Sequence, residues 1–441
     1  MSETLPLTEA TTKILEEKIL SRRARVGVVG LGYVGLPLAV EFAKAGFSVT
    51  GIDVSAEKTR RVNAGDSYVG DVRSATLASL VESGKLRATT DFAAVLELDT
   101  INICVPTPLR KTKDPDMSFI VSACQEISRH FHAGMLVILE STTYPGTTDE
   151  LVLPMLTKSG LEVGRDFFLC FSPERVDPGN PNFQTSNIPK VVGGCTAECT
   201  EMGRLFYSQA LQTVIPVSST QVAEMVKLLE NTFRMINIGL VNEIALMCDR
   251  IGINVWEVID AAATKPFGFM PFYPGPGLGG HCIPIDPFYL SWKTRQAGIE
   301  ARFIDLAGYI NGQMPHFVVD KIQNALNDAG KPVKGSRIHV MGVAYKRDID
   351  DMRESPALDV MLLLKRRGAV VSYSDPHVPA LHLEDLDLQA LPQSAAAAAD
   401  CVAIITDHSS FDYKNLVELA PLIVDSRNAL KAYRSDKIVR L

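Results

Sequence analysis

A glycine pattern near the N-terminus constrains the fold of this chain more than any other feature. The apolar run Arg25 to Val29 leads into Gly30-Leu31-Gly32-Tyr33-Val34-Gly35, and a helix-forming stretch from Leu36 to Ala45 follows. In that context the first glycine permits a tight turn, the second lets a pyrophosphate approach the backbone, and the third allows close helix packing. A helix N-terminus also attracts phosphate charge. The segment therefore predicts a dinucleotide-binding βαβ unit.

An acidic residue at the end of the next apolar run strengthens this prediction. Asp53 follows Ser48 to Ile52, where a carboxylate can accept hydrogen bonds from both hydroxyls of an adenosine ribose. Its charge repels a 2′-phosphate, so we expect NAD rather than NADP as the cofactor. The alternative is a vestigial Rossmann domain that holds no cofactor. The residues predicted to form the cofactor site are Gly30, Gly32, Tyr33, Val34 and Asp53.

The order of apolar runs and helical stretches predicts an α/β chain. Short apolar runs alternate with helical stretches over residues 25–210, which is typical of a doubly wound parallel sheet. From Ser219 to Gly252 apolar residues recur at intervals of three and four and predict one long helix. Strand-like runs then return after residue 336. The expected strands are 25–29, 48–52, 100–105, 136–139, 167–171, 338–341, 369–373, 402–406 and 422–424.

These patterns divide the chain into four predicted parts. We expect two Rossmann-like doubly wound parallel-sheet domains, joined by a long central helix and a helical dimerisation region. The predicted boundaries are a polar N-terminal segment at 1–24, an NAD-binding domain at 25–210, a central helical domain at 211–328 and a second Rossmann-like domain at 329–441. Because the central helix is long and apolar along one side, we also expect a homodimer or a higher homo-oligomer.

Composition excludes several classes of partner. The net charge is -7 and no long basic run occurs, which disfavours nucleic acid and anionic membrane surfaces. No apolar run approaches the roughly 18 residues of a membrane span, and residues 1–24 lack the apolar core of a signal peptide. We therefore expect a cytoplasmic protein. The eight cysteines form no C-x-x-C pair, and Cys195 and Cys199 have no neighbouring His or Cys ligands, so no metal site is expected.

Cys282 is the candidate nucleophile. It lies in Gly275-Pro276-Gly277-Leu278-Gly279-Gly280-His281-Cys282, where little side-chain bulk surrounds the sulfur. A buried structural cysteine is the plainer alternative. Asp286 lies four residues further on and makes a thiol and carboxylate pair, although a helix cap before Pro287 explains it equally well.

Two polar residues of the predicted long helix share one of its faces. Lys227 and Asn231 are four residues apart, so an ammonium and an amide can together donate to an oxygen that gains negative charge. A solvated stripe is the alternative. Three loops after predicted strands carry further polar groups, namely Thr107, Thr142 and Glu174. A desolvated Glu174 could hold a proton or activate water near neutral pH, whereas an isolated glutamate is more often a surface residue.

Six motifs in this order resemble those of the UDP-sugar 6-dehydrogenases, the family that includes UDP-glucose and UDP-N-acetylhexosamine dehydrogenases. They are Gly30-Leu31-Gly32-Tyr33-Val34-Gly35-Leu36-Pro37, Val105-Pro106-Thr107-Pro108, Ser172-Pro173-Glu174-Arg175, Lys227-Leu228-Leu229-Glu230-Asn231, Gly279-Gly280-His281-Cys282 and Tyr345-Lys346-Arg347-Asp348. The resemblance covers nearly the whole chain. It implies two successive oxidations of a sugar C6 alcohol to a carboxylate, with two NAD per turnover.

The resemblance also implies a role for individual residues. Cys282 traps the aldehyde as a thiohemiacetal that becomes a thioester, Lys227 and Asn231 stabilise the oxyanion, and Lys227 is a candidate base for the alcohol. Glu174 is the acid-base residue of thioester hydrolysis, and Asp286 is the carboxylate beside the nucleophile. Thr107, Thr142 and Lys58 match cofactor contacts. The domain at 329–441 matches the UDP-sugar-binding half, and the residues implied for the substrate are Arg175, Val176, Lys227, Asn231, Tyr273, Gly279, Lys346 and Arg427.

Departures from the UDP-glucose pattern point to the N-acetylhexosamine branch. His281, Ile285 and Pro178 stand where UDP-glucose members usually carry Ser, Lys and a second Glu. UDP-N-acetylglucosamine is the first choice of substrate, for a polysaccharide or O-antigen precursor, and the manno and galacto epimers and UDP-glucose are alternatives. A 3-hydroxyacid dehydrogenase is a rival that needs neither Cys282 nor a second α/β domain. A non-catalytic NAD-sensing interaction protein is the rival from another class.

Overall fold

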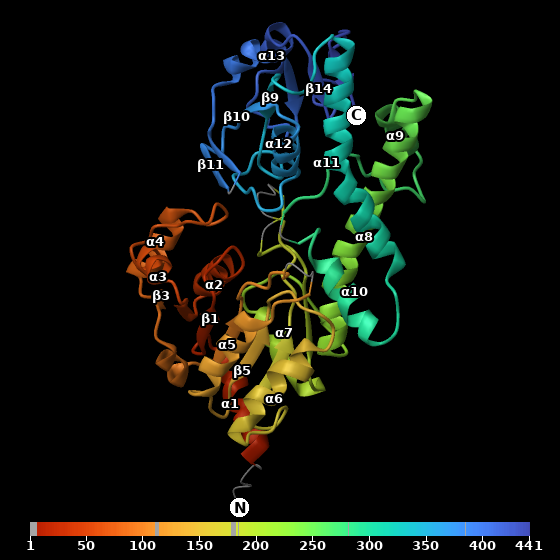
Figure 1. Cartoon of the computed structure of the whole chain (residues 1–441). Coiled ribbons are helices and arrows are strands. Elements are labelled where there is room, and N and C mark those ends of the chain that lie inside the picture. The colour runs from red at the N-terminus through yellow and green to blue at the C-terminus, as the bar shows by residue number, and fades with distance from the viewer. Residues whose placement is uncertain (1–6, 111–113, 178–181, 184, 281, 384) are drawn as a thin grey trace, which may run out of the picture. The chain divides into compact units, whose positions relative to one another are not determined.

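The computed structural model describes residues 7–110, 114–177, 182–183, 185–280, 282–383 and 385–441 (Figure 1). The chain divides into two compact units. The first comprises Met1–Glu230 with Trp292–Ala297, and the second comprises Asn231–Ser291 with Gly298–Leu441. Within the described ranges, no helix combines the length and the apolar character that a membrane crossing requires.

The first unit contains a sheet of eight strands in the order β3-β2-β1-β4-β5-β6-β7-β8. Neighbouring strands run parallel except at β6 and β7, which pair antiparallel through Cys170↔Gly194 and Phe171↔Gly193. The predicted doubly wound α/β class is therefore confirmed, with an antiparallel extension that the sequence did not predict. The strands are β1 (Arg25–Val29), β2 (Ser48–Ile52), β3 (Leu86–Thr89), β4 (Thr100–Ile103), β5 (Leu136–Leu139), β6 (Phe168–Phe171), β7 (Lys190–Gly194) and β8 (Val214–Val217).

Helices cover both faces of this sheet. Alternate strand residues point to opposite faces, so Val28 belongs to a core with Phe42 and Phe206, whereas Val29 belongs to a second core with Ile127. The rings of Phe42 and Phe206 stack with centroids 4.4 Å apart. The helices are α1 (Leu7–Leu20), α2 (Gly35–Lys44), α3 (Ala56–Asn63), α4 (Ser74–Glu82), α5 (Ser118–Ser128), α6 (Leu153–Leu156) and α7 (Ala197–Tyr207), with the shorter turns η1 (Phe92–Glu97), η2 (Thr148–Val152) and η3 (Thr157–Ser159).

The N-terminal segment is more than a polar extension. Helix α1 buries Leu15 and Ile19 in the same core as Phe42, and the Lys18 ammonium lies 2.6 Å from the Asp99 carboxylate. This helix was not predicted, because its charged residues outnumber the few apolar positions that face the sheet. The segment is therefore an integral part of the first unit.

The predicted long helix is confirmed as α8 (Thr220–Ile251), a single element of 32 residues. Its first turns belong to the first unit and its remainder to the second. The second unit also contains α9 (Val255–Ala263), most of α10 (Asp286–Gln296) and α11 (Arg302–Asp328). Met235 of α8 packs with Ile304 and Ala307 of α11, so an apolar contact joins the two longest helices of this unit.

The C-terminal part of the second unit is another parallel sheet, in the order β10-β9-β13-β14-β15, with an antiparallel hairpin of β11 and β12 beside it. Ser355 accepts a hydrogen bond from the amide of Ala357 and so caps the helix that begins at Pro356. The alanine run 395–399 forms a 3-10 turn rather than an α-helix. The elements are β9 (Arg337–Met341), β10 (Val370–Ser374), β11 (Ala380–Leu383), β12 (Leu386–Gln389), β13 (Cys401–Ile404), β14 (Ile423–Asp425), β15 (Ile438–Arg440), α12 (Pro356–Arg366), η4 (Gln393–Ala398) and α13 (Tyr413–Leu419).

Candidate active site

The glycine loop between β1 and α2 has the geometry that a pyrophosphate requires. Gly30 has a φ of +92°, and a Cβ there would lie 2.6 Å from the Cys104 carbonyl oxygen. A Cβ at Gly35 would lie 1.8 Å from the Gly30 carbonyl oxygen, so neither position accepts a side chain. Around Gly32, by contrast, no heavy atom of the described chain lies within 4 Å of the Cβ position, and Val34 offers no side-chain cap to α2. These residues fit the phosphates of a dinucleotide.

Asp53 connects the glycine loop to the following helix. Its carboxylate is 6% exposed and accepts hydrogen bonds from the amides of Leu31 (2.8 Å) and Ser55 (2.9 Å). The Lys58 ammonium lies 3.4 Å from the same carboxylate. Tyr68 donates from its hydroxyl to the Leu31 carbonyl oxygen at 2.6 Å and braces the loop from a second side. Tyr68 could not be predicted from the sequence, because its loop has no recognisable motif. Tyr33 is half exposed at the rim of the loop.

We expect Asp53→Ala to weaken NAD binding by about 10- to 100-fold, because a charged acceptor is lost from the loop and from the ribose. Titration calorimetry with NAD measures this loss, and binding of the UDP-sugar serves as the internal reference. Glu57→Ala is the matched control, because it removes an exposed carboxylate of the same helix α3, one that forms an ion pair with Arg60. An equal loss of both ligands in Asp53→Ala would indicate misfolding instead.

Two further loops leave the same end of the sheet. Thr107 follows β4 and is buried, and Thr142 follows β5 and is half buried. Because β4 and β5 are parallel neighbours, their carboxyl ends meet at one edge, and Ser141 links the loops by donating to the Val105 carbonyl oxygen at 2.7 Å. The predicted neighbourhood of Thr107 and Thr142 is therefore present at the edge where such sheets bind ligands. Their contact with the cofactor stays a prediction.

Glu224 ties the loop after β5 to helix α8. Its buried carboxylate accepts hydrogen bonds from the amides of Gly146 (2.6 Å) and Thr148 (2.9 Å) and from the Thr148 hydroxyl (2.7 Å). Burial raises the pKa of Glu224 to about 7, although these donors favour the ionised form. Sequence reasoning missed this residue. Its position three residues before Lys227 gives it no chemical signature of its own.

Glu174, in the loop after β6, lies among positive and polar groups. One carboxylate oxygen accepts hydrogen bonds from the amides of Arg175 (2.7 Å) and Val176 (2.8 Å), and the other lies 3.3 Å from the Lys190 ammonium. Burial alone raises the pKa of Glu174, but the charge of Lys190 and the two amides outweigh it and hold that pKa below its usual value. Of the two roles that the sequence leaves open, this environment favours the ionised carboxylate that activates water.

The same loop is fastened to α8 by two cations. Lys227 donates from its ammonium to the carbonyl oxygen of Glu174 at 2.6 Å. Arg175 forms a forked ion pair with Glu230, with nitrogen to oxygen distances of 2.6 and 3.2 Å. Lys227 therefore lies at the Glu174 loop as the proposed chemistry requires, whereas the charge of Arg175 is already paired within the protein. The backbone amide of Val176, which was also implied for the substrate, donates to the Glu174 carboxylate.

The segment that carries Cys282 connects to the next turn of α8. Asn231 donates from its side-chain amide to the Asp286 carboxylate at 2.6 Å, and both side chains are almost completely buried. The amides of Ile285 and Asp286 donate to the Cys282 carbonyl oxygen at 3.1 and 2.8 Å, which forms the turn into α10. Cys282 thus lies four residues before Asp286, the first residue of α10. His281, whose role the sequence left open, lies outside the described residues, as does Pro178.

Cys282 differs from most of the other cysteines in its exposure. All eight are free; Cys195 and Cys282 are half buried, and the others are buried. The pKa of Cys195 is raised by burial and by a hydrogen bond with Asp149, which suppresses its thiolate. Burial likewise raises the pKa of Cys124 and of Cys401 to about 12. Cys282 is therefore more exposed than the fully buried thiol of the plainer interpretation, and its role as the nucleophile stays a prediction.

The glycines before Cys282 allow that loop to approach the C-terminal domain. A Cβ at Gly279 would lie 2.6 Å from the Tyr345 Cβ, and one at Gly275 would lie 2.8 Å from an Arg427 guanidinium nitrogen. Gly280 has a φ of +86° and would meet the Tyr345 ring at 2.8 Å. The predicted contact residue Gly279 thus packs against the loop that also carries Lys346. Close packing therefore accounts for these three glycines, in addition to the access to the Cys282 sulfur that the sequence suggests.

Arg427 is a cation in surroundings that disfavour its charge. Its Nε donates to the Ile405 carbonyl oxygen at 2.9 Å. Burial and the neighbouring Arg347 guanidinium lower the pKa of Arg427 to about 10. A bound anion would relieve both effects, which suits the diphosphate expected there. Tyr273, another predicted substrate contact, instead donates from its hydroxyl to Asp260 at 2.7 Å and stacks on Trp256 with ring centroids 6.0 Å apart.

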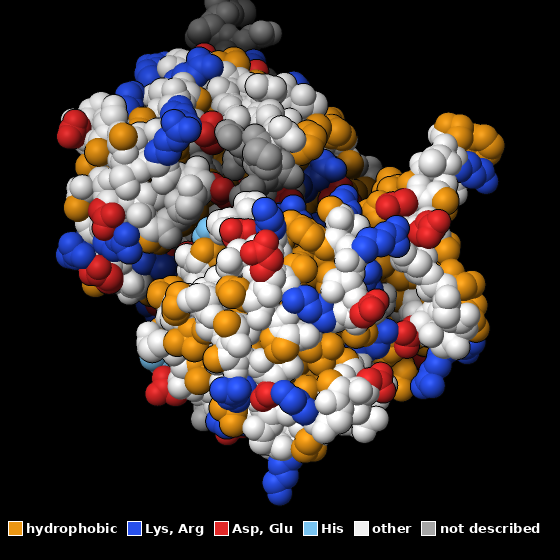
Figure 2. All heavy atoms as spheres, turned by 90° about the horizontal axis from the view of Figure 1, so that it is seen from above, with side chains coloured by type: hydrophobic (Ala, Val, Ile, Leu, Met, Phe, Trp, Pro, Cys, Tyr) orange, Lys and Arg blue, Asp and Glu red, His pale blue; other side chains and the backbone are white. Residues whose placement is uncertain are grey.

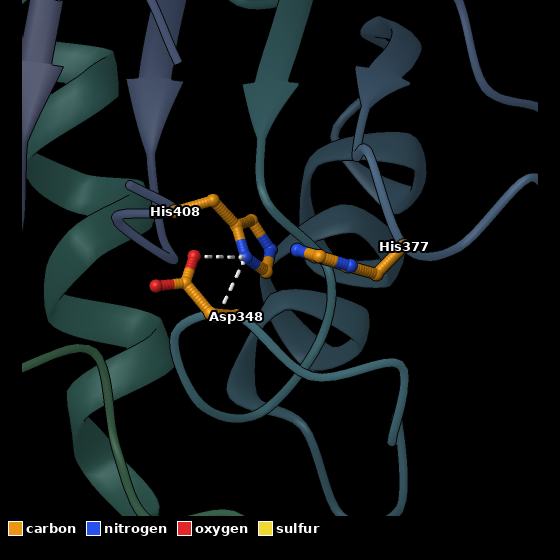
Figure 3. A group of neighbouring side chains, drawn as sticks. All are labelled: Asp348, His377 and His408. Atoms are coloured by element: carbon orange, nitrogen blue, oxygen red, sulfur yellow. Dashed lines mark hydrogen bonds and ion pairs between the residues drawn. The ribbon is translucent and has the colours of Figure 1, made fainter. Parts of the chain in front are cut away.

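The loops after β9, β10 and β13 meet at a cluster of Asp348, His377 and His408 (Figure 3). Such groups can bind a metal, which the sequence analysis did not expect. Here the Nδ1 of His408 accepts a hydrogen bond from the Asp348 amide at 2.9 Å, and its Nε2 lies 3.0 Å from the Asp375 carboxylate. Because both ring nitrogens are already engaged, the cluster is a hydrogen-bonded brace for the loop that begins at Tyr345. Asp375 occupies the place after β10 that Asp53 occupies after β2, and it also accepts from the amides of Val343 and Ala344.

Together these features describe a chain with a Rossmann domain of the cofactor-binding kind, a long helix that carries polar side chains, a half-buried cysteine and a second Rossmann-like domain. Family comparison identifies the class more closely. The models of the UDP-glucose/GDP-mannose dehydrogenase family match this chain at residues 24–211 (NAD binding domain), 221–313 (central domain) and 339–432 (UDP binding domain). The chain belongs to this family, and it is an NAD-dependent UDP-sugar dehydrogenase. The match to the UDP binding domain removes the 3-hydroxyacid dehydrogenase alternative.

Individual relatives carry different substrate names. The chain is 36% identical over 390 residues to a UDP-N-acetyl-D-glucosamine 6-dehydrogenase of Pseudomonas aeruginosa, covering 88% of this chain and 91% of that protein. It is 35% identical over 403 residues to a UDP-N-acetyl-D-mannosamine dehydrogenase of Salmonella typhi, covering 88% and 94%. The solved structure of a UDP-D-ManNAc dehydrogenase from Pyrococcus horikoshii aligns with a TM-score of 0.87 at 33% identity, covering 94% and 98%.

Proposed function

We propose that this protein oxidises the C6 hydroxyl of a UDP-N-acetylhexosamine to the uronic acid in two successive steps, through a thioester on Cys282. The hydrogen bond between Asn231 and Asp286 carries this proposal, because it joins two of the groups implied for the reaction beside the segment that carries Cys282. An ammonium, an amide, a thiol and a carboxylate are the groups that such a reaction needs.

In the first oxidation, Lys227 is the candidate base: its neutral amine takes the hydroxyl proton and becomes the ammonium. The hydride of each oxidation leaves C6 for NAD, which is the chemistry that the cofactor supplies when bound. The Cys282 sulfur then forms a bond to the aldehyde carbon, and the carbonyl oxygen takes up the thiol proton. Lys227 and Asn231 donate hydrogen bonds to that oxygen while it carries negative charge. Because the sugar is now covalently held, the reactive aldehyde does not escape.

Hydrolysis ends the reaction. After the second hydride has left, C6 is the carbonyl carbon of a thioester with Cys282. The Glu174 carboxylate removes a proton from water, the water oxygen bonds to C6, and the bond between carbon and sulfur breaks with the sulfur leaving as thiolate. The position of the Glu174 carboxylate supports this role, since Lys190 and the amides of Arg175 and Val176 hold it in one orientation.

UDP-N-acetylglucosamine is the proposed substrate, for the synthesis of a surface polysaccharide such as an O-antigen. His281, Ile285 and Pro178 favour an N-acetylhexosamine over glucose. The Pseudomonas aeruginosa relative supports the gluco epimer, and the Salmonella typhi relative supports the manno epimer as the second candidate. Arg427 and Lys346 are proposed to bind the diphosphate.

We expect two NADH to form for each UDP-sugar consumed. The measurement combines NADH absorbance with chromatography of UDP-GlcNAc, UDP-ManNAc, UDP-GalNAc and UDP-glucose after reaction, so that it also ranks the four substrates. One NADH per sugar, with an aldehyde as product, would contradict the covalent scheme. Absence of turnover with all four would instead favour the NAD-sensing alternative.

The long helix also supports a homodimer. Leu229, Phe233 and Leu240 of α8 are 59%, 45% and 53% exposed, although they belong to its predicted apolar stripe. Figure 2 shows hydrophobic side chains between interspersed positive and negative ones on the face drawn. An apolar stripe of this kind marks an interaction surface. We propose that a second copy of the chain covers it, and light scattering at micromolar concentration tests this: a monomer mass would refute it.

A further inference from the structure

Lys190 lies at the start of β7, and no motif of the sequence singles it out. Its side chain is 5% exposed, and its ammonium lies 2.5 Å from the Glu140 carboxylate and 3.3 Å from that of Glu174. The buried Lys190 ammonium therefore forms an ion pair with both carboxylates. Burial lowers the pKa of Lys190, but the charges of Glu140 and Glu174 outweigh it and hold that pKa above its usual value. The group is thus a permanent positive charge beside Glu174.

Glu140 fixes the ammonium in place. Its side chain is completely buried, and one oxygen accepts hydrogen bonds from the Tyr207 hydroxyl and, at 2.8 Å, from the Asn102 amide. The other oxygen holds Lys190. Because β4, β7, α7 and the residue directly after β5 each contribute one partner, the position of the Lys190 ammonium follows from the packing of the sheet. The backbone supports this arrangement, since Ser172 donates to the Val191 carbonyl oxygen at 2.7 Å.

We infer that Lys190 is a positioning residue that fixes the orientation and the charge of the Glu174 carboxylate for thioester hydrolysis. This inference rests on the role proposed for Glu174. Lys190 holds one carboxylate oxygen, and the amides of Arg175 and Val176 hold the other. With both oxygens engaged, the carboxylate can present a lone pair to water in only a narrow range of directions.

Other charges around Glu174 contribute less directly. Lys227, on α8, donates to the backbone oxygen of Glu174 rather than to its carboxylate, and the guanidinium of Arg175 is neutralised by Glu230. Tyr207 and Cys104 lie near Glu140, and burial raises the pKa of both groups, which favours their neutral forms. Lys190 is therefore the cation among these groups that contacts the carboxylate itself.

The test measures thioester hydrolysis against pH. The acyl-enzyme is formed with UDP-sugar and excess NAD, samples are quenched in acid, and the mass of the Cys282 peptide reports the thioester that remains. The hydrolysis rate falls in acid as Glu174 takes up a proton. We expect Lys190→Met to move this fall to higher pH by about 1 pH unit or more, because an adjacent opposite charge lowers a carboxyl pKa by that amount. Lys190→Arg should restore most of the wild-type profile.

A second pair of variants separates positioning from folding, because Lys190→Met leaves Glu140 buried without its cation. Lys190→Met/Glu140→Gln removes both charges of the structural ion pair, whereas Glu140→Gln alone keeps the ammonium beside Glu174. We expect the fall in the hydrolysis rate to move to higher pH in the double variant and to stay at the wild-type pH in Glu140→Gln. Superimposable profiles for the two would overturn the inference.

Glu174→Gln distinguishes this failure from failure of the proposed function. If Glu174→Gln hydrolyses the thioester at the wild-type rate, the role of Glu174 itself is wrong. If Glu174→Gln accumulates thioester while the double variant keeps the wild-type profile, only the inference about Lys190 is wrong.

Discussion

Replacement of Cys282 by serine is expected to abolish formation of the uronic acid while both ligands still bind. A serine hydroxyl is almost entirely protonated at neutral pH, so it cannot trap the aldehyde as a thiolate does. We expect the rate of acid formation to fall on the order of 1,000-fold or more, the range seen when a catalytic nucleophile is removed. Chromatography of the sugar nucleotide after prolonged incubation with NAD measures the loss.

The matched control is Cys195→Ser. Cys195 is the other half-buried thiol, and its sulfur donates to the Asp149 carboxylate at 3.1 Å, a hydrogen bond that a serine hydroxyl can keep. We expect this variant to retain wild-type turnover. Equal acid yield from Cys282→Ser and the wild type would remove the covalent intermediate from the mechanism, whatever the control does.

Much of the fold could be predicted because its signals are local. The glycine pattern, Asp53 and the alternation of apolar runs specify the first strands and α2, and three predicted strands, 25–29, 48–52 and 136–139, agree residue for residue with β1, β2 and β5. Helix α8 likewise follows from a periodic apolar pattern. Strands β3, β7 and β8 were missed, since β3 mixes charged with apolar residues and the β8 run contains Pro216.

In the candidate site, too, some residues could be predicted from local sequence signals and others could not. Residues that carry reactive groups in recognisable motifs, such as Cys282, Lys227 and Glu174, could be proposed from the sequence. Residues that act by holding these groups could not, because their partners are far along the chain: Lys190 lies 50 residues from Glu140, and Glu224 lies 78 residues from Gly146. Only the antiparallel pairing of β7 with β6 brings Lys190 to the Glu174 loop.

Conversion of Glu174 to glutamine is expected to stop the reaction one step later than loss of the thiol does. Glutamine keeps the size of the side chain but cannot accept a proton from water, so hydrolysis should slow by roughly 100- to 10,000-fold, the usual contribution of a general base. The two oxidations do not need this carboxylate. We therefore expect a burst of two NADH per active site, followed by slow turnover and a thioester on Cys282 that mass spectrometry detects.

Glu162→Gln is the control for this variant, because Glu162 is an exposed residue of the turn before β6 that pairs with Arg165. It should turn over without accumulating thioester. The pH dependence gives a second criterion. The wild-type rate of hydrolysis should fall only when acid protonates Glu174, below the usual carboxyl range because its pKa is lowered, and that acid limb should be absent from Glu174→Gln. An acid limb that persists unchanged in Glu174→Gln would assign the titrating base to another residue.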